Sequence, residues 1–357
     1  MQTHHLTYVW QDFAGNLRQK VKIEEMVPND FYNPSKYPVW NFDGSSTGQA
    51  TRQDSEVLIY PVRIYNNRFR KGNLSFIVLC ECRMPNGTAH PTNHRVKAEE
   101  IFNRMIETCV SDDKDVILRE TAEQYYEPWF GIEQEFFVID RSTGFPIGYD
   151  AGGTQGKYYC SVDSVLNNML NKMLDVSCDF GLRVTGSNIE VAPGQAEIQL
   201  LSKGLKACDD LLMLRYVITT VANDYNYDID YYPKVLEGDW NGSGAHVNYS
   251  TKYMRQSENK DAYKHIMHAI NQFQQHHEKH ISVYGDGNDK RLTGEHETSN
   301  LHTFSYGIAD RGASIRIPRT THEKGYGYIE DRRPSSNFNP YLVLPLIFET
   351  STLQLSE

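Results

Sequence analysis

A stretch of strand-forming residues with two glutamates, one residue apart, constrains this chain most. Residues 129–139 (WFGIEQEFFVI) are rich in aromatic and β-branched side chains and run into the turn signal DRSTG at 140–144. That composition and ending are typical of a strand. Because side chains on a strand alternate between its two faces, Glu133 and Glu135 should share one face.

A second stretch, residues 189–198 (IEVAPGQAEI), adds two more glutamates. Its Pro193 and Gly194 suit the two central positions of a type II turn, so the flanking residues should fold back as a hairpin. With those residues at the tip, we expect Glu190 and Glu197 to be directly paired neighbours on one face.

Four carboxylates gathered in this way need a counter-charge. Two like charges about 5 Å apart, at an effective dielectric constant of about 20, repel by roughly 3 kcal/mol. Divalent cations would offset that repulsion, and ligand sets made only of oxygen favour Mg²⁺ or Mn²⁺ over zinc. The alternative for Glu133 and Glu135 alone is a solvated sheet face, since antiparallel sheets often have one wet side. Two such pairs favour the metal interpretation.

The composition of the 357 residues is that of an ordinary soluble globular protein, with 39% apolar and 23% charged residues. A net charge of -10 argues against nucleic acid or an anionic membrane as the main partner. The amino terminus has no signal-peptide pattern and no apolar run approaches membrane-spanning length, so we expect a cytoplasmic protein. The cysteines have no Cys-x-x-Cys spacing, which indicates neither a disulfide scaffold nor a zinc knuckle.

The chain divides into a β-rich first part and a larger part that interleaves helices and strands. Strand character is found at 6–9, 17–23, 57–64 and 74–84, which predicts a small β domain over residues 1–94. The rest, 95–357, shows no internal repeat and is predicted to be a single α+β domain.

Helical periodicity recurs in five segments, which are 96–109, 162–181, 205–225, 263–280 and 341–353. Near the end of the fourth segment lie His276, His277 and His280, and residues four apart on a helix share a face. A metal site is one interpretation. A solvated helix end is favoured, because no third ligand follows and histidine suits a helix C-terminus.

A glycine-rich loop at 238–244 leads into an alternating segment in which His246, Asn248 and Ser250 should share one face. Glycines let a ligand approach the backbone closely, and His246 is a further candidate metal ligand. The last third of this acidic chain concentrates arginines, namely Arg291, Arg311, Arg316, Arg319, Arg332 and Arg333. Arginine forks are the preferred partners of phosphates and carboxylates, although Arg319 and Arg333 are equally compatible with structural ion pairs. A carboxylate metal site beside arginines is what phosphoryl transfer from a nucleotide requires.

Several stretches, in order along nearly the whole chain, resemble those of the type II, eukaryotic-type glutamine synthetase family. They are WNFDGSST (40–47), FGIEQE (130–135), WNGSGAH (240–246), RLTGEHETSN (291–300), ASIRIPR (313–319) and YIEDRRPS (328–335). The resemblance implies a small N-terminal β-grasp domain followed by a large catalytic domain built on a curved antiparallel sheet flanked by helices. It also implies a homo-oligomer, a decamer of two pentameric rings, with active sites between neighbouring subunits.

The resemblance also implies roles for individual residues. One metal site would be formed by Glu133, His246 and Glu330, and the other by Glu135, Glu190 and Glu197, together holding two or three Mg²⁺ or Mn²⁺ ions. ATP would be bound by His246, Asn248, Ser250, Arg311, Arg316 and Tyr328, and glutamate by Asn241, Gly242, Arg291 and Arg332. The catalytic residues would be Asp43, Glu297, Arg311 and Arg316, with Asp43 binding ammonium at the site of an adjacent chain and Glu297 as a flap. The implied reaction makes glutamine from glutamate, ammonia and ATP through a γ-glutamyl phosphate.

Two positions depart from the family pattern. Ala196 stands where members usually carry Trp, and Glu295 replaces an apolar or aromatic residue in the flap. We expect an intact enzyme with altered metal or glutamate affinity. Two alternatives compete with the ammonia ligase, namely a ligase of the same fold that joins glutamate to another amine, and a catalytically silent structural homologue. The presence of Asp43, Glu297 and all the implied metal ligands argues against both.

Overall fold

The fold was examined in a computed structural model that describes residues 2–26, 30–70, 74–109, 117–156 and 165–352. Contacts along the chain divide it into two compact units. The first comprises residues 1–99 with 176–182, and the second comprises residues 100–175 with 183–357. The β-grasp assignment and the domain boundary at residue 94 stay predictions.

The first unit contains a five-stranded mixed sheet in the order β2-β1-β5-β4-β3. Its elements are β1 (Gln2–Gln11), β2 (Leu17–Met26), η1 (Pro34–Lys36), β3 (Trp40–Asp43), η2 (Gly44–Thr47), β4 (Glu56–Asn66) and β5 (Ser75–Arg83). All four segments with strand character therefore form strands. The central pair, β1 and β5, is parallel, and its inward side chains, including Leu6, Tyr8, Phe76 and Val78, are completely or almost completely buried.

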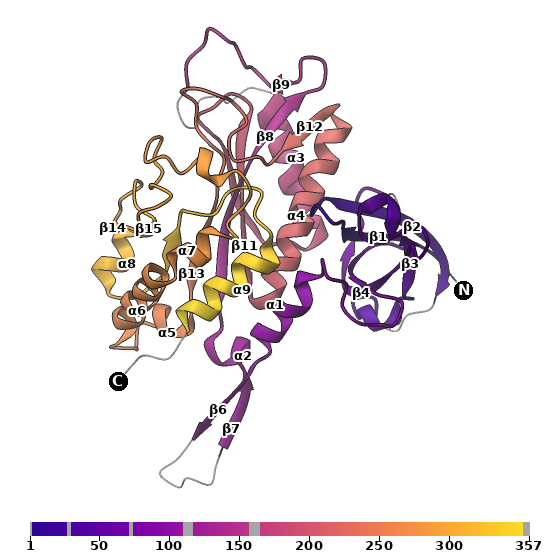
Figure 1. The fold of residues 1–357 in the computed structure, drawn as a ribbon, viewed down its shortest axis with the longest axis horizontal. Coiled ribbons are helices and arrows are strands. Elements are labelled where there is room, and N and C mark those ends of the chain that lie inside the picture. Colours follow the sequence, from indigo (N-terminus) through magenta and orange to yellow (C-terminus); the bar gives the residue numbers. More distant parts are fainter. Residues whose placement is uncertain (1, 27–29, 71–73, 110–116, 157–164, 353–357) are drawn as a thin grey trace. The chain divides into compact units, whose positions relative to one another are not determined.

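The second unit is organised around a nine-stranded sheet (Figure 1). Its strands are β8 (Trp129–Asp140), β9 (Phe145–Pro146), β10 (Val184–Ile189), β11 (Gln195–Lys203), β12 (Tyr227–Asp230), β13 (Ala245–Ser250), β14 (Tyr306–Ile308), β15 (Ile315–Ile317) and β16 (Ile329–Asp331). The main path runs β10-β11-β8-β13-β16-β15-β14, with β12 and β9 also pairing with β8. The sheet is antiparallel as expected, apart from the parallel pair of β14 and β15.

Helices complete the second unit. They are α2 (Ala122–Tyr126), α3 (Val165–Phe180), α4 (Gly204–Asp224), α5 (Lys252–Arg255), α6 (Ala262–Gln275), α7 (His277–Ile281), α8 (Arg319–Lys324) and α9 (Pro340–Ser351), with the short 3-10 helix η3 (Asn288–Lys290); α1 (His94–Phe102) spans the boundary and α3 ends in the first unit. The long α4 packs on β8, β11 and α9, and α9 also contacts α6. Gln134 of β8 accepts a hydrogen bond from Arg215 of α4, so the even-numbered side chains of β8 face this helix layer. The odd-numbered side chains, Glu133 and Glu135 among them, occupy the opposite face.

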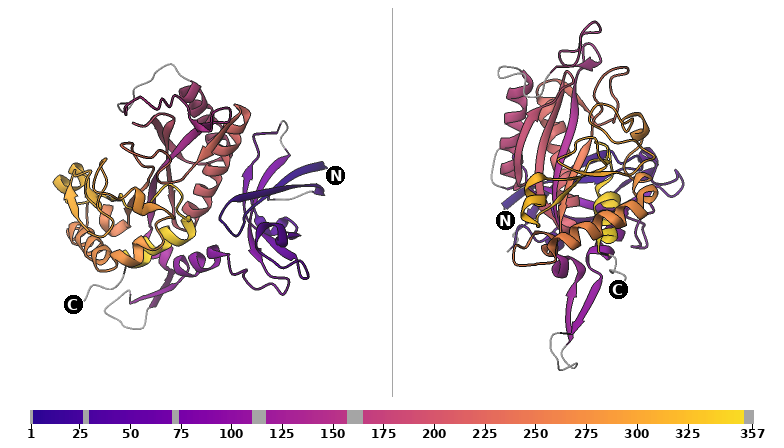
Figure 2. Two further views of the ribbon diagram at one scale, coloured as in Figure 1. Left: turned by 45° about the horizontal axis from the view of Figure 1, so that its top comes forward. Right: turned by 90° about the vertical axis from the view of Figure 1, so that its left-hand side faces the viewer.

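Two helix predictions need correction. The helix predicted over 96–109 ends at Phe102, and residues Met105–Cys109 form β6, which pairs with β7 (Ile117–Thr121). This two-stranded ribbon extends away from the rest of the second unit (Figures 1 and 2). The helix predicted over 263–280 is interrupted at His276, which caps both α6 and α7. Within the described residues, no helix is long and apolar enough to span a membrane.

Candidate active site

The register of the central strands brings the predicted site residues together. Glu135 of β8 is directly opposite Glu197 of β11, and Glu133 of β8 is directly opposite His246 of β13. On the far side of β13, Glu330 of β16 lies between Asn248 and Arg316. Directly opposed residues in a sheet have their Cβ atoms about 5 Å apart. Sheet pairing alone therefore places carboxylates, an imidazole and a guanidinium along one face.

The hairpin that carries Glu190 and Glu197 forms, but its register differs from the prediction. Gln195 N–H donates to the Ala192 carbonyl and Gly194 has a φ of +71°, as a type II turn requires. Glu197 nevertheless pairs with Asn188 rather than with Glu190. The prediction extended the ladder straight from the turn, whereas the chain leaves the ladder after Ile189 and forms a wider loop. The shift is two residues, an even number, so Glu190 keeps the face of Glu197.

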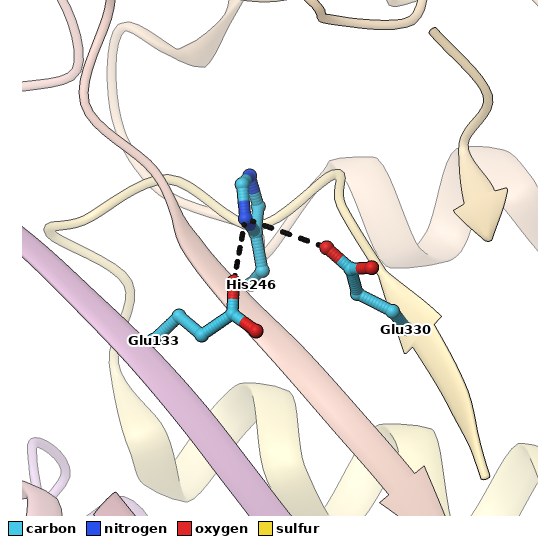
Figure 3. A group of neighbouring side chains, drawn as sticks. All are labelled: Glu133, His246 and Glu330. Atoms are coloured by element: carbon cyan, nitrogen blue, oxygen red, sulfur yellow. Dashed lines mark hydrogen bonds and ion pairs between the residues drawn. The ribbon is translucent and has the colours of Figure 1, made fainter. Parts of the chain in front are cut away.

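Two groups of potential metal ligands result. In the first, one ligand atom from each of Glu133, His246 and Glu330 lies within 4.8 Å of the others. Figure 3 shows both carboxylates directed at the same ring nitrogen, His246 Nδ1, at 3.2 Å from Glu133 Oε2 and 3.7 Å from Glu330 Oε1. In the second group, Glu135, Glu190 and Glu197 satisfy the same 4.8 Å criterion, and all three residues are buried.

Burial of the second group strongly disfavours its negative charge. Burial raises the pKa of Glu135 to about 7, although the neighbouring Arg291 opposes this shift. The pKa of Glu190 is raised to about 8 by burial and by Glu135, and that of Glu197 to about 9 by burial and by Glu133. Carboxyl groups with raised pKa values are typical of functional sites. A bound cation would restore their ionised forms, because ligands bind metals in deprotonated form.

The imidazole of His246 is suited to metal binding because it is held neutral. Burial, and then Arg332, keep its pKa well below the usual range for histidine. Arg291 Nη2 donates to His246 Nε2 at 3.0 Å, so in this arrangement the neutral ring carries its proton on Nδ1 and directs it at Glu133. Binding a cation through Nδ1 would use the other tautomer. Carboxylate oxygens with one neutral imidazole form a donor set that fits Mg²⁺ or Mn²⁺.

Arg316 and Arg332 contact the first group directly, and Arg311 is connected to it through Arg332. Arg316 and Arg332 hold the two oxygens of the Glu330 carboxylate, at 2.7 Å and 2.5 Å respectively. Arg332 also donates to the backbone carbonyls of Arg311 and Glu297, at 3.0 Å and 3.2 Å. Arg311 pairs in turn with the Glu297 carboxylate at 3.0 Å. The predicted flap residue Glu297 is thus bonded to Arg311, a predicted phosphate-binding residue, and through its backbone to Arg332, a predicted glutamate-binding residue.

A pocket lies beside these groups. Its lining combines carboxylates with the residues expected to bind glutamate. The carboxylates are Glu135, Glu190 and Glu297, and the expected glutamate-binding residues are Asn241, Gly242, Arg291 and Arg332. Gln195, His246, His296 and Thr298 complete the lining. The flap that borders it has an unusual backbone, because the consecutive residues His296 and Glu297 both have positive φ, at +51° and +59°. Such conformations are uncommon in residues other than glycine, and they cluster at functional sites.

The remaining expected site residues lie on two other parts of the chain. Asn248 donates to Glu133 Oε1 at 2.8 Å, Ser250 is buried at the end of β13, and Tyr328, immediately before β16, is 44% exposed. Asp43 lies in the first unit at the end of β3, where it is exposed. Its carboxylate accepts hydrogen bonds from the hydroxyl and backbone N–H of Ser45, which hold its pKa below the usual value.

Comparison with known proteins assigns the fold and site to a family. The model of the glutamine synthetase catalytic domain matches residues 115–352. The chain belongs to the glutamine synthetase family. It is 42% identical over 354 residues to glutamine synthetase PR-1 of Phaseolus vulgaris, covering 97% of this chain and 93% of that protein. Glutamine synthetase cytosolic isozyme 1-1 of Oryza sativa subsp. japonica is 41% identical, covering 97% of this chain and 93% of that protein. Glutamine synthetase cytosolic isozyme 1-5 of Arabidopsis thaliana is 42% identical, covering 97% of this chain and 94% of that protein.

Where this chain departs from the glutamine synthetase pattern, the structure locates both changes. Ala196 is completely buried and pairs with Phe136, so its side chain lies on the helix-covered face of the sheet and not among the carboxylates. Glu295 is exposed, directly before the two flap residues with positive φ. The predicted changes in metal or glutamate affinity stay predictions.

One interpretation of the sequence was wrong. His277 and His280 do not form a solvated helix end, because they are 8% and 0% exposed. Both accept hydrogen-bond contacts from Arg333, at 3.0 Å and 3.4 Å, and Arg333 is itself fully buried in an ion pair of 2.7 Å with Asp331. Arg333 therefore forms a structural ion pair, which was one of the two roles predicted for it, and it directly follows Arg332 in the chain.

Sequence reasoning also missed Gln195. Its side chain is 1% exposed and donates to Glu135 Oε2. The signal was available, since strand alternation places residue 195 on the same face as Glu197.

Proposed function

We propose that this protein is an ATP-dependent glutamate–ammonia ligase, which makes glutamine through a γ-glutamyl phosphate. The observation that carries the proposal is the convergence of two groups of metal-ligand residues with buried arginines at one pocket, in a chain of the glutamine synthetase family. Phosphoryl transfer depends mainly on positioning and on neutralising spread negative charge, and this pocket is built for both.

Divalent cations fit the two groups. Glu133, His246 and Glu330 would hold one ion and Glu135, Glu190 and Glu197 another, with Mg²⁺ or Mn²⁺ as the cation and room for two or three ions per site. When bound, such ions act as Lewis acids that polarise phosphoryl oxygens and neutralise developing charge. The raised pKa values of the second group are the physical reason for this assignment.

The nucleotide would lie over the strand end formed by β13, β15 and β16. Arg316 and Arg311 are placed to offset charge on the phosphates and on the transferred phosphoryl group, since guanidinium forks match phosphate oxygens. His246, Asn248, Ser250 and Tyr328 would complete the ATP-binding surface. Arg316 Nε is buried without a hydrogen-bond partner among the described residues.

Glutamate would bind against Asn241, Gly242, Arg291 and Arg332 at the wall of the pocket. Burial lowers the pKa of Arg291 to about 10, so its guanidinium stays charged near neutral pH and can neutralise a carboxylate. Phosphorylation of the γ-carboxylate by ATP makes a good leaving group, and attack by ammonia on that carbonyl carbon then releases phosphate and forms glutamine. Glu297, on the strained flap, would keep water away from the acyl phosphate.

Ammonium is not a nucleophile, so a base must accept one of its protons. The family resemblance gives this role to Asp43, and its depressed pKa keeps it anionic, which favours binding of the ammonium cation. We propose that Asp43 acts at the active site of an adjacent subunit in a homo-oligomer, the decamer of two pentameric rings that the family resemblance implies. We further propose a cytoplasmic location.

The proposal is tested by measuring glutamine and phosphate formation from glutamate and ATP with Mg²⁺ or Mn²⁺, with and without ammonium. We expect product only when ammonium is present. Asp43→Ala should reduce the ammonium-dependent rate far more than it weakens ATP binding. Phosphate release that responds to small polyamines but not to ammonium would favour a ligase for another amine, and no turnover with any amine would favour a silent homologue.

A further inference from the structure

The side chain of Gln195 lies at the wall of the pocket, between the second group of carboxylates and the glycine-rich loop. Its amide nitrogen is 3.0 Å from Glu135 Oε2 and 3.0 Å from the backbone carbonyl oxygen of Gly242. One side chain therefore touches a candidate metal ligand and a candidate glutamate-binding backbone at once.

The orientation of this amide is fixed by its partners. A backbone carbonyl can only accept hydrogen bonds, so the group beside Gly242 must be the NH₂ end of the amide. Both hydrogens of that NH₂ are then used, one on Gly242 and one on Glu135. Gln195 is 1% exposed, so no water-facing rotamer competes with this arrangement.

Glu135 is held from a second direction by the same loop. The backbone N–H of Gly244 donates to Glu135 Oε2 at 2.7 Å, and the backbone N–H of Glu135 donates to the Gly244 carbonyl at 3.1 Å. Two donors thus occupy Oε2, whereas Oε1 accepts no hydrogen bond from the described residues. The carboxylate is therefore oriented with one oxygen used by the loop and one available to a cation.

The loop in turn packs closely on Arg291. A Cβ atom placed on Gly244 would be 2.4 Å from Arg291 Nη2, and one placed on Gly242 would be 2.7 Å from Arg291 Cγ. Such distances leave no room for a side chain at either glycine, so the loop lies directly against Arg291. Gln195, Glu135, Gly242 and Arg291 consequently form one packed unit.

We propose that Gln195 is a positioning residue that couples cation binding at Glu135 to glutamate binding at the Gly242 loop. This inference rests on the proposed function, because it takes glutamate as the ligand of the loop. Coupling of this kind is reciprocal, so a bound cation should tighten glutamate binding by the same factor as glutamate tightens cation binding.

Gln195→Met tests the proposal, because methionine keeps the volume of glutamine but donates no hydrogen bond. We expect the Mn²⁺ dissociation constant of the whole protein, measured by titration calorimetry with the metal alone, to rise about 10-fold, the lower end for lost contacts to a metal ligand. The coupling is measured by the ratio of the Mn²⁺ affinity with glutamate to the Mn²⁺ affinity without it, and a ratio of one means no coupling. Such ratios are typically about 5- to 150-fold. In Gln195→Met the ratio should fall towards one by at least about threefold. Gln195→Leu, which is of similar size and has neither a donor nor a charge, should behave like Gln195→Met.

Gln199→Met is the matched control. Gln199 lies on the same strand and its Nε2 donates to Glu197 Oε1 at 2.8 Å, another candidate ligand, but it has no hydrogen bond to the glycine loop. This variant should weaken Mn²⁺ binding while the glutamate-dependent ratio stays at its original value. The control therefore distinguishes the effect of losing a hydrogen bond to a candidate metal ligand from the effect of losing the coupling between cation and glutamate binding.

The outcomes are distinct. Gln195→Met with unchanged Mn²⁺ affinity, or with the same coupling ratio as Gln199→Met, would overturn the inference. If Gln195→Met does not fold, Gln195→Leu provides the same comparison, because leucine also lacks a donor and adds no charge. Failure of the unaltered protein to form glutamine would refute the proposed function alone, because the Mn²⁺ titrations require no turnover.

Discussion

At the scale of single residues, Glu197 has the largest pKa shift among the three carboxyls of the second group, raised to about 9. Its charge is unfavourable unless a cation shares the site. We expect Glu197→Gln to lower Mn²⁺ affinity at this group by more than about 10-fold, and calorimetry should count one ion fewer at moderate metal concentration. The exposed Glu278, changed to Gln, serves as the control and should leave the stoichiometry unaltered. Equal ion counts in both variants would contradict the metal assignment.

His280 provides a pH prediction remote from the metal ligands. Burial, and then Arg333, lower its pKa from 6.5 to about 3; Asp331 favours its charged form, while His276 and Lys279 oppose it. As the pH falls below 6.5, His280 becomes protonated in the unfolded chain but stays neutral in the folded chain. This difference lowers the free energy of unfolding progressively between pH 6.5 and pH 3. Between pH 6.5 and 5 the loss should be roughly 2 kcal/mol, at 1.36 kcal/mol per unit.

Urea denaturation of the unaltered protein and His280→Gln, at several pH values and in the presence of a metal chelator, measures this effect. The variant should be less stable overall because it loses contacts to Tyr284 and Thr350. Its free energy of unfolding should nevertheless decline less steeply between pH 6.5 and 5. Parallel curves for the two proteins would show that His280 does not contribute.

At the scale of elements, β16 combines a site residue with a buried ion pair. Asp331 follows Glu330 and bonds Arg333 through both oxygens, at 2.9 Å and 2.7 Å, with neither side chain more than 1% exposed. Removing one partner of a buried pair leaves an uncompensated charge, so Asp331→Asn should lower the free energy of unfolding by about 3–5 kcal/mol. Glu107→Gln, which removes an exposed pair with Arg119, should have no measurable effect in the same denaturation experiment.

The same elements show which parts of the site could be predicted from sequence. Alternation along a strand is a local rule, and it correctly placed Glu133 with Glu135 and His246 with Asn248 on shared faces. Register is not local. The pairing of Glu197 with Asn188 depends on where the ladder stops before the turn, which Pro193 and Gly194 do not specify.

Long-range partners were beyond the sequence for a related reason. His277 and Arg333 are far apart in the chain but are in contact in the fold. Helical spacing describes only neighbouring residues, so it could not predict that a buried guanidinium from another element would contact this histidine. The segment 105–109 had helical spacing, yet pairing with 117–121 made it a strand, because tertiary context overrides weak local preference. Motif resemblance, in contrast, predicted which residues lie together in the two groups of potential ligands, because it carries information about the fold that periodicity lacks.

At the scale of the whole molecule, the two units carry different parts of the proposed machinery. Asp43 belongs to the first unit, and every candidate metal ligand belongs to the second. If Asp43 serves an adjacent subunit, an active site is complete only when two chains each contribute an intact part. That arrangement can be tested without knowing the number of subunits, because it concerns only which chain supplies which residue.

Asp43→Ala and Glu197→Gln should each be nearly inactive when produced alone. Co-expressed in equal amounts as hybrid oligomers, they should regain activity, because a site whose first unit comes from the Glu197→Gln chain and whose second unit comes from the Asp43→Ala chain is fully native. With random assembly about a quarter of the sites meet that condition, so about a quarter of the original rate is expected. A site made within one chain would give no recovery, since every chain in the hybrid carries a defect.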